Sequence, residues 1–181
     1  MDVAIDYEEL KYSRRKLRQL WYAINEGKAD AYGWDSGKAL EYFVLRAFQL
    51  EGAEVRWPFD VKIADSTVEQ IDGVIYSDGL ACLVECKDWS TKINIEPIAK
   101  LRNQLLRRPG ASIGLVFSRQ GFTDPALTLA RFALPQTILL WTGEELSLAL
   151  EKRMMREGLI AKYRRCVEEG LPDYNLREEW L

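Results

Sequence analysis

The chain contains 181 residues, of which 48% are apolar and 11% are aromatic, and its net charge at pH 7 is −3. This length is typical of a single domain with a substantial core. Because the sequence has no histidine, it excludes Ser-His-Asp and Cys-His catalysis and any histidine-ligated zinc site. Any chemistry must come from carboxylates, lysine and a hard cation.

The cysteines, Cys82, Cys86 and Cys166, have no regular spacing, which argues against a disulfide framework. They are typical of small buried hydrophobic residues in a reducing compartment. No apolar run approaches the roughly 20 residues of a membrane span. The acidic N-terminus is not typical of a signal peptide. We therefore expect a cytoplasmic protein with no membrane contact.

Charge is unevenly distributed along the chain. Residues 35–90 contain 5 basic and 11 acidic residues, a balance of −6, whereas residues 91–170 contain 13 basic and 8 acidic residues, a balance of +5. An acidic segment beside a basic one is typical of a metal site next to a phosphate-binding surface. Chance segregation of charges on solvated faces explains the distribution equally well.

The N-terminal part of the chain predicts two helices. The first spans residues 6–25, where apolar residues recur at helical spacing beside a group of basic residues, and an irregular linker at 27–37 follows. The second helix spans residues 36–51, with Ser36 or Asp35 as its cap and a glycine at its end. Its apolar stripe contains a carboxylate, Glu41. A buried carboxylate needs a partner or an opening to a cleft, although an outward-facing charge at the edge of the stripe is the simpler interpretation.

A strand at residues 53–59 and a β-hairpin are expected next. Apolar runs at 70–76 and 80–87 are joined by Ser77-Asp78-Gly79, a typical hairpin turn. Because side chains alternate along a strand, Leu83, Glu85 and Lys87 share one face of the second run, and Cys82, Val84 and Cys86 share the other. Two opposite charges at the end of such an apolar strand are unusual.

The second half of the chain predicts a helix at 92–108, a buried strand at 112–117, a helix at 123–133, a strand at 137–141 and a long helix at 143–170. Pro97 fits the first turn of its helix, and Thr123 or Asp124 fits a cap. A polar tail closes the chain. This order predicts an α/β fold with a mixed central sheet of about five strands flanked by helices. We expect a single domain over 1–181, with a helix and linker at 1–34, a core at 35–142 and a helix and tail at 143–181.

Asp72 and Glu85 are expected to lie opposite each other, because the hairpin turn sets the register of their strands. Two adjacent carboxylates repel each other unless a cation lies between them. Oxygen ligands suit Mg²⁺ or Mn²⁺, and the backbone carbonyl of Cys86 is a further candidate ligand. Lys87 lies on the Glu85 face, where it can orient or deprotonate a water or neutralise phosphate charge. Glu41 is a candidate third carboxylate. These parts together indicate metal-assisted phosphodiester hydrolysis.

Asp72, twelve residues and then Glu85-Cys86-Lys87 resemble the D…(D/E)-x-K signature of the restriction-endonuclease-like nucleases. With Glu41 on a preceding helix and Asp88-Trp89 following, the sequence is most similar to the Mrr-like and Holliday-junction-resolvase-like branch. The usual Pro-Asp is Ile-Asp here. The resemblance covers about residues 36–140 and implies a restriction-endonuclease-like core.

The resemblance also implies roles for individual residues. Asp72 and Glu85 would bind the metal and Lys87 would be the catalytic lysine, while Glu41 would match a helical glutamate that some members use. Gln104, on the helix after the motif, would match a polar residue near the site. Lys100 and Arg102 are basic residues of the same helix, and we expect them to support the site or to contact the substrate phosphates. The implied activity is that of a Mg²⁺-dependent endonuclease acting on duplex or branched DNA, without a small-molecule cofactor.

Other interpretations remain open. Glu85 and Lys87 would be worth about 0–1 kcal/mol as a surface ion pair, Asp72-Gly73 would also fit a bulge, and the basic helices would also fit solvated faces. An inactive nuclease-fold protein that binds DNA or serves as a scaffold is the alternative function, favoured by the acidic pI of about 5.2. An RNA-processing nuclease would use the same residues. Because cutting both strands requires two sites, we expect a homodimer.

Overall fold

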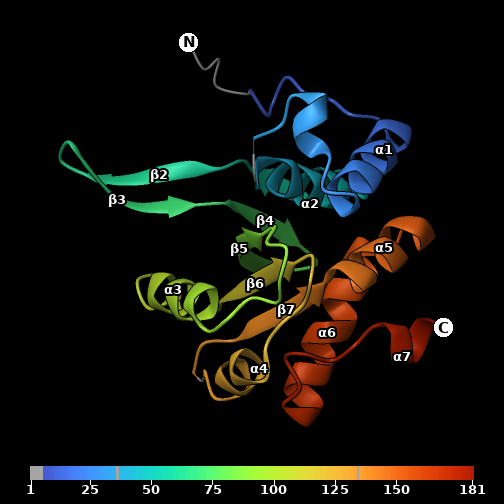
Figure 1. Ribbon diagram of the computed structural model, residues 1–181. Helices are drawn as coiled ribbons and strands as arrows, with labels where there is room; N and C mark the ends of the chain where they lie inside the picture. The colour runs from blue at the N-terminus through green and yellow to red at the C-terminus, as the bar shows by residue number, and fades with distance from the viewer. Residues whose placement is uncertain (1–5, 36, 134) are drawn as a thin grey trace.

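A five-stranded mixed sheet forms the centre of a computed structural model that describes residues 6–35, 37–133 and 135–181 (Figure 1). In spatial order its strands are β1 (Glu54–Arg56), β4 (Gly73–Ser77), β5 (Leu80–Lys87), β6 (Ser112–Ser118) and β7 (Ile138–Thr142). The first three pair antiparallel, and β5, β6 and β7 pair in parallel. The expected α/β class and mixed sheet are confirmed.

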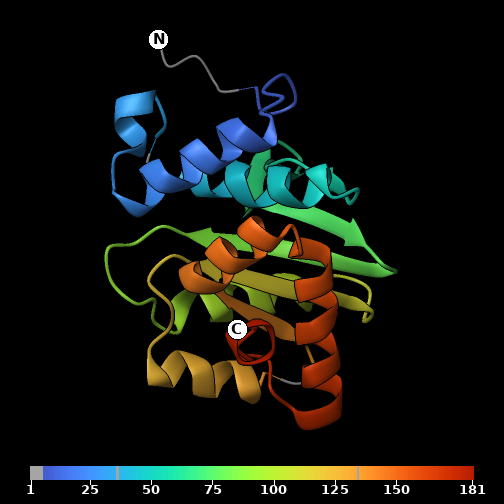
Figure 2. The ribbon, with the colours of Figure 1, turned by 90° about the vertical axis from the view of Figure 1, so that its right-hand side faces the viewer.

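Helices cover both faces of this sheet (Figures 1 and 2). One face carries α1 (Arg14–Asn25), α2 (Lys38–Leu50), α5 (Gly143–Lys152) and α6 (Met155–Glu169). The other face carries α3 (Glu96–Leu105) and α4 (Asp124–Arg131). No helix in the described ranges is long and apolar enough to cross a membrane.

The alternation predicted for β5 is confirmed by the two hydrophobic cores. Cys82, Val84 and Cys86 belong to the core beneath α2, and Leu83 belongs to the core beneath α3. Glu85 and Lys87 follow Leu83 at every second position, so they point toward the α3 side. β5 therefore carries its charged residues on the face that α3 covers.

The N-terminal helix is shorter than predicted. α1 begins at Arg14 because the Ser13 side chain caps it, accepting a hydrogen bond from the Lys16 amide at 3.3 Å. The segment before it turns back over α2, and the Tyr12 amide donates to the Tyr42 hydroxyl at 3.0 Å. The predicted linker contains a 3₁₀ helix, η1 (Ala29–Tyr32).

The cap predicted for α2 is wrong. The N-cap is Gly37, with a φ of 83°, and no side chain caps the helix. Ser36 lies outside the described residues, and Asp35 contributes only its carbonyl, which accepts from the Lys38 amide at 3.1 Å. Gly52, with a φ of 96°, follows the end of the helix as expected.

A two-stranded arm extends from the sheet and was not predicted (Figure 1). The strand expected at 53–59 ends at Arg56, and the chain continues into β2 (Phe59–Ile63) and β3 (Ser66–Ile71). The run expected at 70–76 is therefore interrupted, because β3 ends one residue before Asp72 and β4 begins one residue after it. Asp72 lies where the chain passes from the arm into the main sheet.

The C-terminal part also differs from the prediction. The single helix expected at 143–170 is divided at Arg153, which has a φ of 58°. The tail is docked rather than free, ending in α7 (Arg177–Trp180), and the Leu176 side chain is fully buried. The buried Lys162–Glu145 ion pair, at 2.6 Å, holds this tail, because Lys162 donates to the Tyr174 carbonyl and Glu145 accepts from the Leu176 amide.

The remaining elements match their predictions within a few residues. α3 is shorter than the predicted 92–108 but has Pro97 in its first turn, and Thr123 caps α4, accepting from the Ala126 amide at 3.4 Å. Ile93, predicted to be helical, instead pairs with Phe122 in an isolated bridge. This bridge brings the loop after β5 back beside the loop after β6.

Candidate active site

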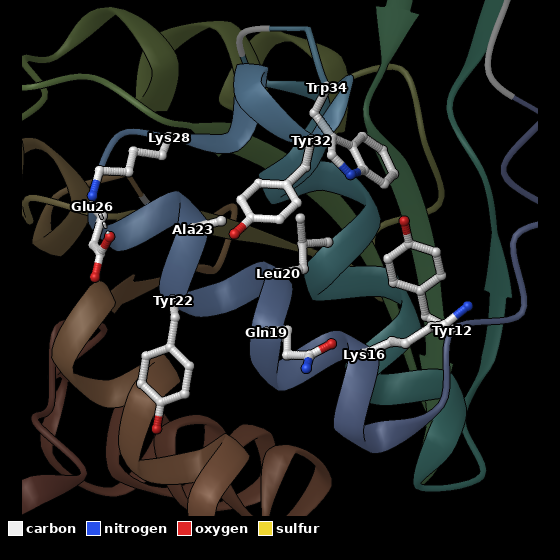
Figure 3. Close-up of a pocket in the computed structure, with 10 residues that line it drawn as sticks. All are labelled: Tyr12, Lys16, Gln19, Leu20, Tyr22, Ala23, Glu26, Lys28, Tyr32 and Trp34. Atoms are coloured by element: carbon white, nitrogen blue, oxygen red, sulfur yellow. Dashed lines mark hydrogen bonds and ion pairs between the residues drawn. The ribbon is translucent and has the colours of Figure 1, made fainter.

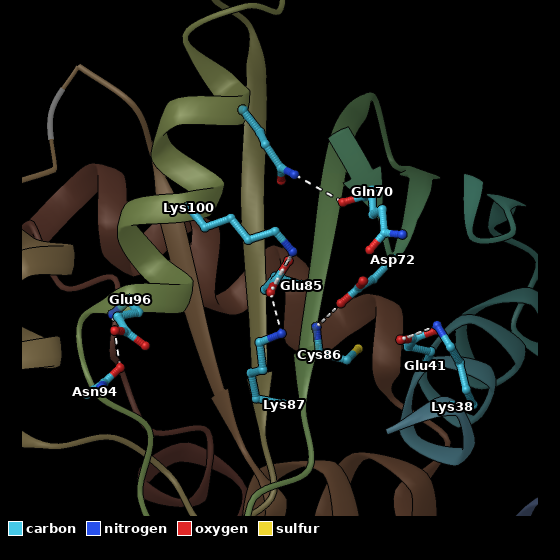
Figure 4. Close-up of polar contacts among 11 residues, drawn as sticks. Lys38, Glu41, Gln70, Asp72, Glu85, Cys86, Lys87, Asn94, Glu96 and Lys100 are labelled. Carbon is cyan, nitrogen blue, oxygen red and sulfur yellow. Dashed lines mark hydrogen bonds and ion pairs between the residues drawn. The ribbon is translucent and has the colours of Figure 1, made fainter. Parts of the chain in front are cut away.

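The Asp72 carboxylate caps the open edge of β5. The ladder between β4 and β5 ends with Gly73 opposite Val84, so Asp72 lies level with Glu85, as predicted. There the chain bends into the arm and β5 loses its neighbouring strand. The Cys86 amide consequently donates to Oδ2 of Asp72, at 2.8 Å, rather than to a backbone carbonyl (Figure 4). A buried amide needs such a partner.

Gly73 fixes this bend because the space beside it is full. A Cβ at this position would lie 2.7 Å from the Leu45 side chain and 3.0 Å from the Arg56 carbonyl oxygen. Both neighbours belong to elements that pack against β4. Any larger residue would therefore push β4 away from α2 and move Asp72.

Glu85 is fully buried and is held by two lysines. Lys87, from the same strand, places its Nζ 2.8 Å from Oε1 of Glu85. Lys100 reaches across from α3, and its Nζ lies 3.0 Å from Oε1 and 2.7 Å from Oε2 (Figure 4). Both oxygens of the carboxylate are thus neutralised by ammonium groups, as a buried charge requires.

The charge state of Lys87 follows from its neighbours. Burial alone would lower the pKa of Lys87, but the charge of Glu85, the hydrogen bond to it and the charge of Asp72 together raise the pKa above its ordinary value. Lys87 is therefore an ammonium ion at neutral pH. Among the roles expected for Lys87, its charge favours neutralisation of phosphate charge over deprotonation of a water.

Asp72 is less favourably placed as an anion. Burial and the negative charge of Glu85 raise the pKa of Asp72, while the Cys86 amide and the two lysine ammonium groups oppose that rise. On balance the pKa of Asp72 is raised, so its carboxylate is not fully compensated by the positive charges around it. A divalent cation between Asp72 and Glu85 would supply further positive charge.

Glu41 lies on the other side of Asp72, at the start of α2 (Figure 4). It is 6% exposed and pairs with Lys38, whose Nζ lies 2.9 Å from Oε2. Burial and the charge of Asp72 raise the pKa of Glu41, whereas Lys38 lowers it. Burial also raises the pKa of Tyr7, and the negative charge of Glu41 raises it further.

Neither partner of Glu41 was singled out from the sequence. The spacing of Lys38, three residues before Glu41 on the helix, is a usable signal for an ion pair. Tyr7 gives no such signal, because only the fold brings its segment to α2.

The remaining predicted residues are not brought to the carboxylates in the same way. Gln104 is buried, and its Nε2 donates to the Gln70 carbonyl at 3.1 Å, so it ties α3 to the strand that precedes Asp72. The Arg102 Nε is buried and has no hydrogen-bond partner within the described ranges. For Cys86, the backbone contact found is that of its amide and not of its carbonyl.

The carboxylates at the site suit a metal ion that needs few protein ligands. Across residues 6–35, 37–133 and 135–181, no three Asp, Glu, Cys or His side chains gather closely enough to form a metal cluster. Mg²⁺ commonly uses only one or two protein carboxylates and completes its shell with water and substrate oxygens. Two neighbouring carboxylates that already attract two ammonium groups fit this pattern.

Many of the basic residues expected to face phosphate are already paired. Arg107 and Arg108 both contact Glu69 of the arm, the latter at 2.5 Å. Further along the chain, Arg131, Arg156, Lys162, Arg164 and Arg165 each pair with a carboxylate. Much of the positive charge of residues 91–170 is therefore paired with carboxylates of this chain, mostly at its surface.

Comparison with known families decides the classification of the chain. A family model for restriction endonucleases, Mrr_cat, matches residues 35–150. The chain belongs to this restriction endonuclease family. The matched region contains every residue of the candidate site, from Glu41 to Gln104. No match was found among curated proteins.

A solved restriction endonuclease subunit shares the fold of this chain, and two further solved structures align with it less well. The small subunit of the heterodimeric restriction endonuclease R.BspD6I aligns over 92% of this chain and 95% of its own, with a TM-score of 0.52 and 13% identity. MspJI, solved in complex with a 27-mer oligonucleotide, aligns over 96% of this chain and 40% of its own, with a TM-score of 0.40 and 16% identity. A protein of unknown function, AF1548, aligns over 84% and 79%, with a TM-score of 0.46 and 15% identity.

One cavity on the N-terminal side lies outside the candidate site. It measures about 460 Å³ and lies between α1 and η1 (Figure 3). Aromatic rings form much of its wall, namely those of Tyr12, Tyr22, Tyr32 and Trp34. None of its lining residues belongs to the set predicted from the sequence.

Proposed function

We propose that this restriction endonuclease family member is a Mg²⁺-dependent endodeoxyribonuclease of restriction or repair type. The observation that carries the proposal is the meeting of Asp72, Glu85 and Lys87 at the end of β5, inside the matched region. A buried carboxylate pair beside a lysine is suited to hydrolysis of a phosphodiester.

Asp72 and Glu85 would hold the metal, with Mn²⁺ as a substitute and the Cys86 carbonyl as a further ligand. Their oxygen-only character suits a hard cation. When bound, the metal supplies Lewis-acid stabilisation of the charge that develops on the phosphate. Glu41, whose pKa is raised by burial and by Asp72, is proposed as a third acidic group at the edge of the site.

Lys87 would stabilise the phosphate as an ammonium ion. Its raised pKa keeps it charged at neutral pH, and its side chain is 26% exposed, so it is open to a substrate on one side. An ammonium group aimed at developing negative charge lowers the barrier, because it needs no reorganisation during the reaction. Gln104 would position Asp72 through the Gln70 carbonyl.

DNA would reach the site at the open end of β5, beside α3. Lys100 and Arg102 on this helix are proposed to contact its phosphates, an interaction that weakens with salt. Two copies of the chain would be needed to cut both strands, so we propose a homodimer. The R.BspD6I small subunit is described as part of a heterodimeric enzyme, so the oligomeric state requires its own measurement.

The decisive experiment is a cleavage panel with linear, nicked, branched, methylated and single-stranded DNA and with RNA, each with and without Mg²⁺ or Mn²⁺. We expect divalent-dependent cutting of a DNA substrate that Asp72→Ala and Lys87→Ala abolish. If the parent protein cut only RNA, the substrate class would be RNA and the proposed DNA substrate would be wrong. A variant that cuts as well as the parent would refute the assigned roles.

A second function, that of an inactive nuclease-fold protein that binds DNA or serves as a scaffold, is favoured by one observation. Both oxygens of Glu85 are held by lysines, and no three-carboxylate cluster exists in the described part of the chain. Mn²⁺ titration separates the two functions. Binding that Asp72→Asn or Glu85→Gln weakens supports the enzyme, whereas its absence in the parent supports the scaffold.

A further inference from the structure

We propose that Lys100 is a built-in counter-ion of the metal site, which holds Glu85 in the metal-free protein and is displaced when a divalent cation binds. This inference rests on the proposed function, because it concerns the same carboxylates. It adds a residue that competes with the metal for its ligand.

The contacts of Lys100 resemble those that a small cation would make. Its Nζ lies 3.0 Å and 2.7 Å from the two oxygens of Glu85, a position that bridges the carboxylate. The same ammonium group also stabilises the charge of Asp72. On Glu85, the ammonium group of Lys100 takes the bridging position that a metal ion bound by this carboxylate would take.

Of the two lysines on Glu85, Lys100 is the one that can leave. Lys87 lies two residues from Glu85 on the same strand, and its contact is with Oε1, at 2.8 Å, so it can keep this bond while Oε2 binds a metal. Lys100 comes from a different element, α3, and its side chain is 41% exposed, compared with 26% for Lys87. Its ammonium group therefore reaches water by rotation of its side chain alone.

Charge balance explains why it would leave. In the metal-free protein the carboxylates of Asp72 and Glu85 face the ammonium groups of Lys87 and Lys100, so two negative and two positive charges meet at a partly buried place. A divalent cation bound by Glu85 would lie against the Lys100 ammonium group, and like charges a few ångströms apart repel each other more strongly than they do in bulk water. Departure of Lys100 relieves that repulsion and frees Oε2 of Glu85, while Lys87 stays on Oε1.

The arrangement has a function in the absence of metal. Glu85 is fully buried, and a buried carboxylate with a single partner on one oxygen carries a large desolvation cost. Lys100 offsets that cost until the metal arrives. The site thus keeps its shape without metal, at the expense of some metal affinity.

The test measures metal binding directly, by calorimetric titration of Mn²⁺ into the parent, Lys100→Met, Lys92→Met and Asp72→Asn proteins. Lys100→Met removes the competitor but keeps the aliphatic stem, so we expect Mn²⁺ to bind about tenfold more tightly, the effect of one charge-assisted hydrogen bond. Lys92 is exposed and has no ion pair within the described ranges, so Lys92→Met controls for net charge and should match the parent. Unchanged or weaker binding by Lys100→Met would overturn the inference.

A second measurement uses the unmodified chain and does not depend on the folding of any variant. Acetylation of lysines, followed by mass spectrometry, should increase several-fold at Lys100 when Mn²⁺ is added and should stay constant at Lys92. A Lys100 that is equally reactive with and without Mn²⁺ would overturn the inference. If Asp72→Asn abolishes Mn²⁺ binding while Lys100→Met leaves it unchanged, only the role of Lys100 is refuted. If the parent binds no Mn²⁺, the proposed function and the inference both fail.

Discussion

The Asp72 carboxylate takes the place of a strand partner for Cys86, accepting a hydrogen bond from its backbone amide at 2.8 Å. One side chain thus serves both the sheet and the proposed metal site. These two tasks can be separated, because the hydrogen bond needs only an oxygen acceptor, whereas the metal needs negative charge.

Substitutions of Asp72 should show this separation. Asp72→Ala leaves the Cys86 amide without a partner and should lower the free energy of unfolding by about 1–3 kcal/mol. Asp72→Asn keeps an acceptor and should change that free energy much less, yet it should lose cleavage as completely. Urea denaturation and the cleavage assay measure the two effects. If both variants lost the same free energy of unfolding, Asp72 would not stabilise the sheet by accepting the Cys86 hydrogen bond.

Removal of the Lys87 charge should reduce cleavage without greatly changing metal binding. Lys87→Met is expected to lower the cleavage rate roughly 100- to 1,000-fold, and Lys87→Arg should retain part of the activity because it keeps a cation. Because its pKa is raised above the ordinary value of 10.5, Lys87 loses its proton only at a pH above that value. The cleavage rate should therefore show no decline from lysine deprotonation between neutral pH and pH 9. A general-base lysine would instead give a rate that rises through this range and an inactive arginine variant.

Glu41→Gln should stabilise the fold at neutral pH. The pKa of Glu41 is raised by burial and by Asp72, so the folded protein holds this proton more tightly than the unfolded chain does. Stability therefore falls as the pH rises from below the ordinary value of 4.5 through the raised folded-state pKa. The glutamine removes that loss, a gain of about 0.5–2 kcal/mol at neutral pH.

The gain should vanish below pH 4.5, where Glu41 is protonated in both states. Urea denaturation at the two pH values measures it. A stabilisation that is equal at both would show that the effect is not electrostatic.

The buried Lys162–Glu145 pair should dominate the stability of the C-terminal part. Lys162→Met leaves Glu145 without its ion partner in a fully buried place and removes the bond to the Tyr174 carbonyl, so it should cost about 3–5 kcal/mol. The control is Arg164→Met, which breaks a 3.7 Å pair on the surface and should leave the free energy of unfolding nearly unchanged. Thermal and urea denaturation compare the two, and similar losses would refute the ranking.

Glu69 should hold the arm to the turn that follows α3, at Arg107 and Arg108. This buried carboxylate of β3 contacts both Arg107 and Arg108, and an isolated two-stranded ribbon is marginally stable. Glu69→Gln is therefore expected to speed amide hydrogen exchange in β2 and β3 by several-fold while exchange in β5 and β6 stays constant. Exchange that increases equally in all four strands would indicate global destabilisation instead.

Local patterns predicted much of the fold. The alternation in β5, the turn at Ser77-Asp78-Gly79 and the resulting register with Asp72 level with Glu85 are confirmed. Each depends on a few neighbouring residues, whose backbone preferences are short in range. The roles assigned to Asp72, Glu85, Lys87 and Glu41 remain predictions that the experiments above test.

The features that were missed depend on contacts distant in the sequence. Tyr7 reaches Glu41 only after its segment folds over α2, and the tail docks because Glu145 and Lys162 hold it from other helices. The arm has a local signal, the alternation of Phe59, Val61 and Ile63 with polar residues, but its strands carry so little buried surface that this signal is weak. The ion pair between Lys100 and Glu85 could not be predicted either, because the periodicity of a helix does not indicate which strand residue its side chains contact.

The bend at Asp72 couples the arm to the proposed metal site. On one side of Asp72 lie β2 and β3, which form the arm. On the other side Gly73 is fixed between Leu45 and the Arg56 carbonyl, so Asp72 joins a projecting part of the chain to a fixed one. A molecule that binds to the arm and shifts it would therefore act first on Asp72, the residue that links the arm to the main sheet. The Asp72 carboxylate, whose position matters most for the proposed chemistry, is therefore also the part of the sheet that responds most to contacts made by the arm.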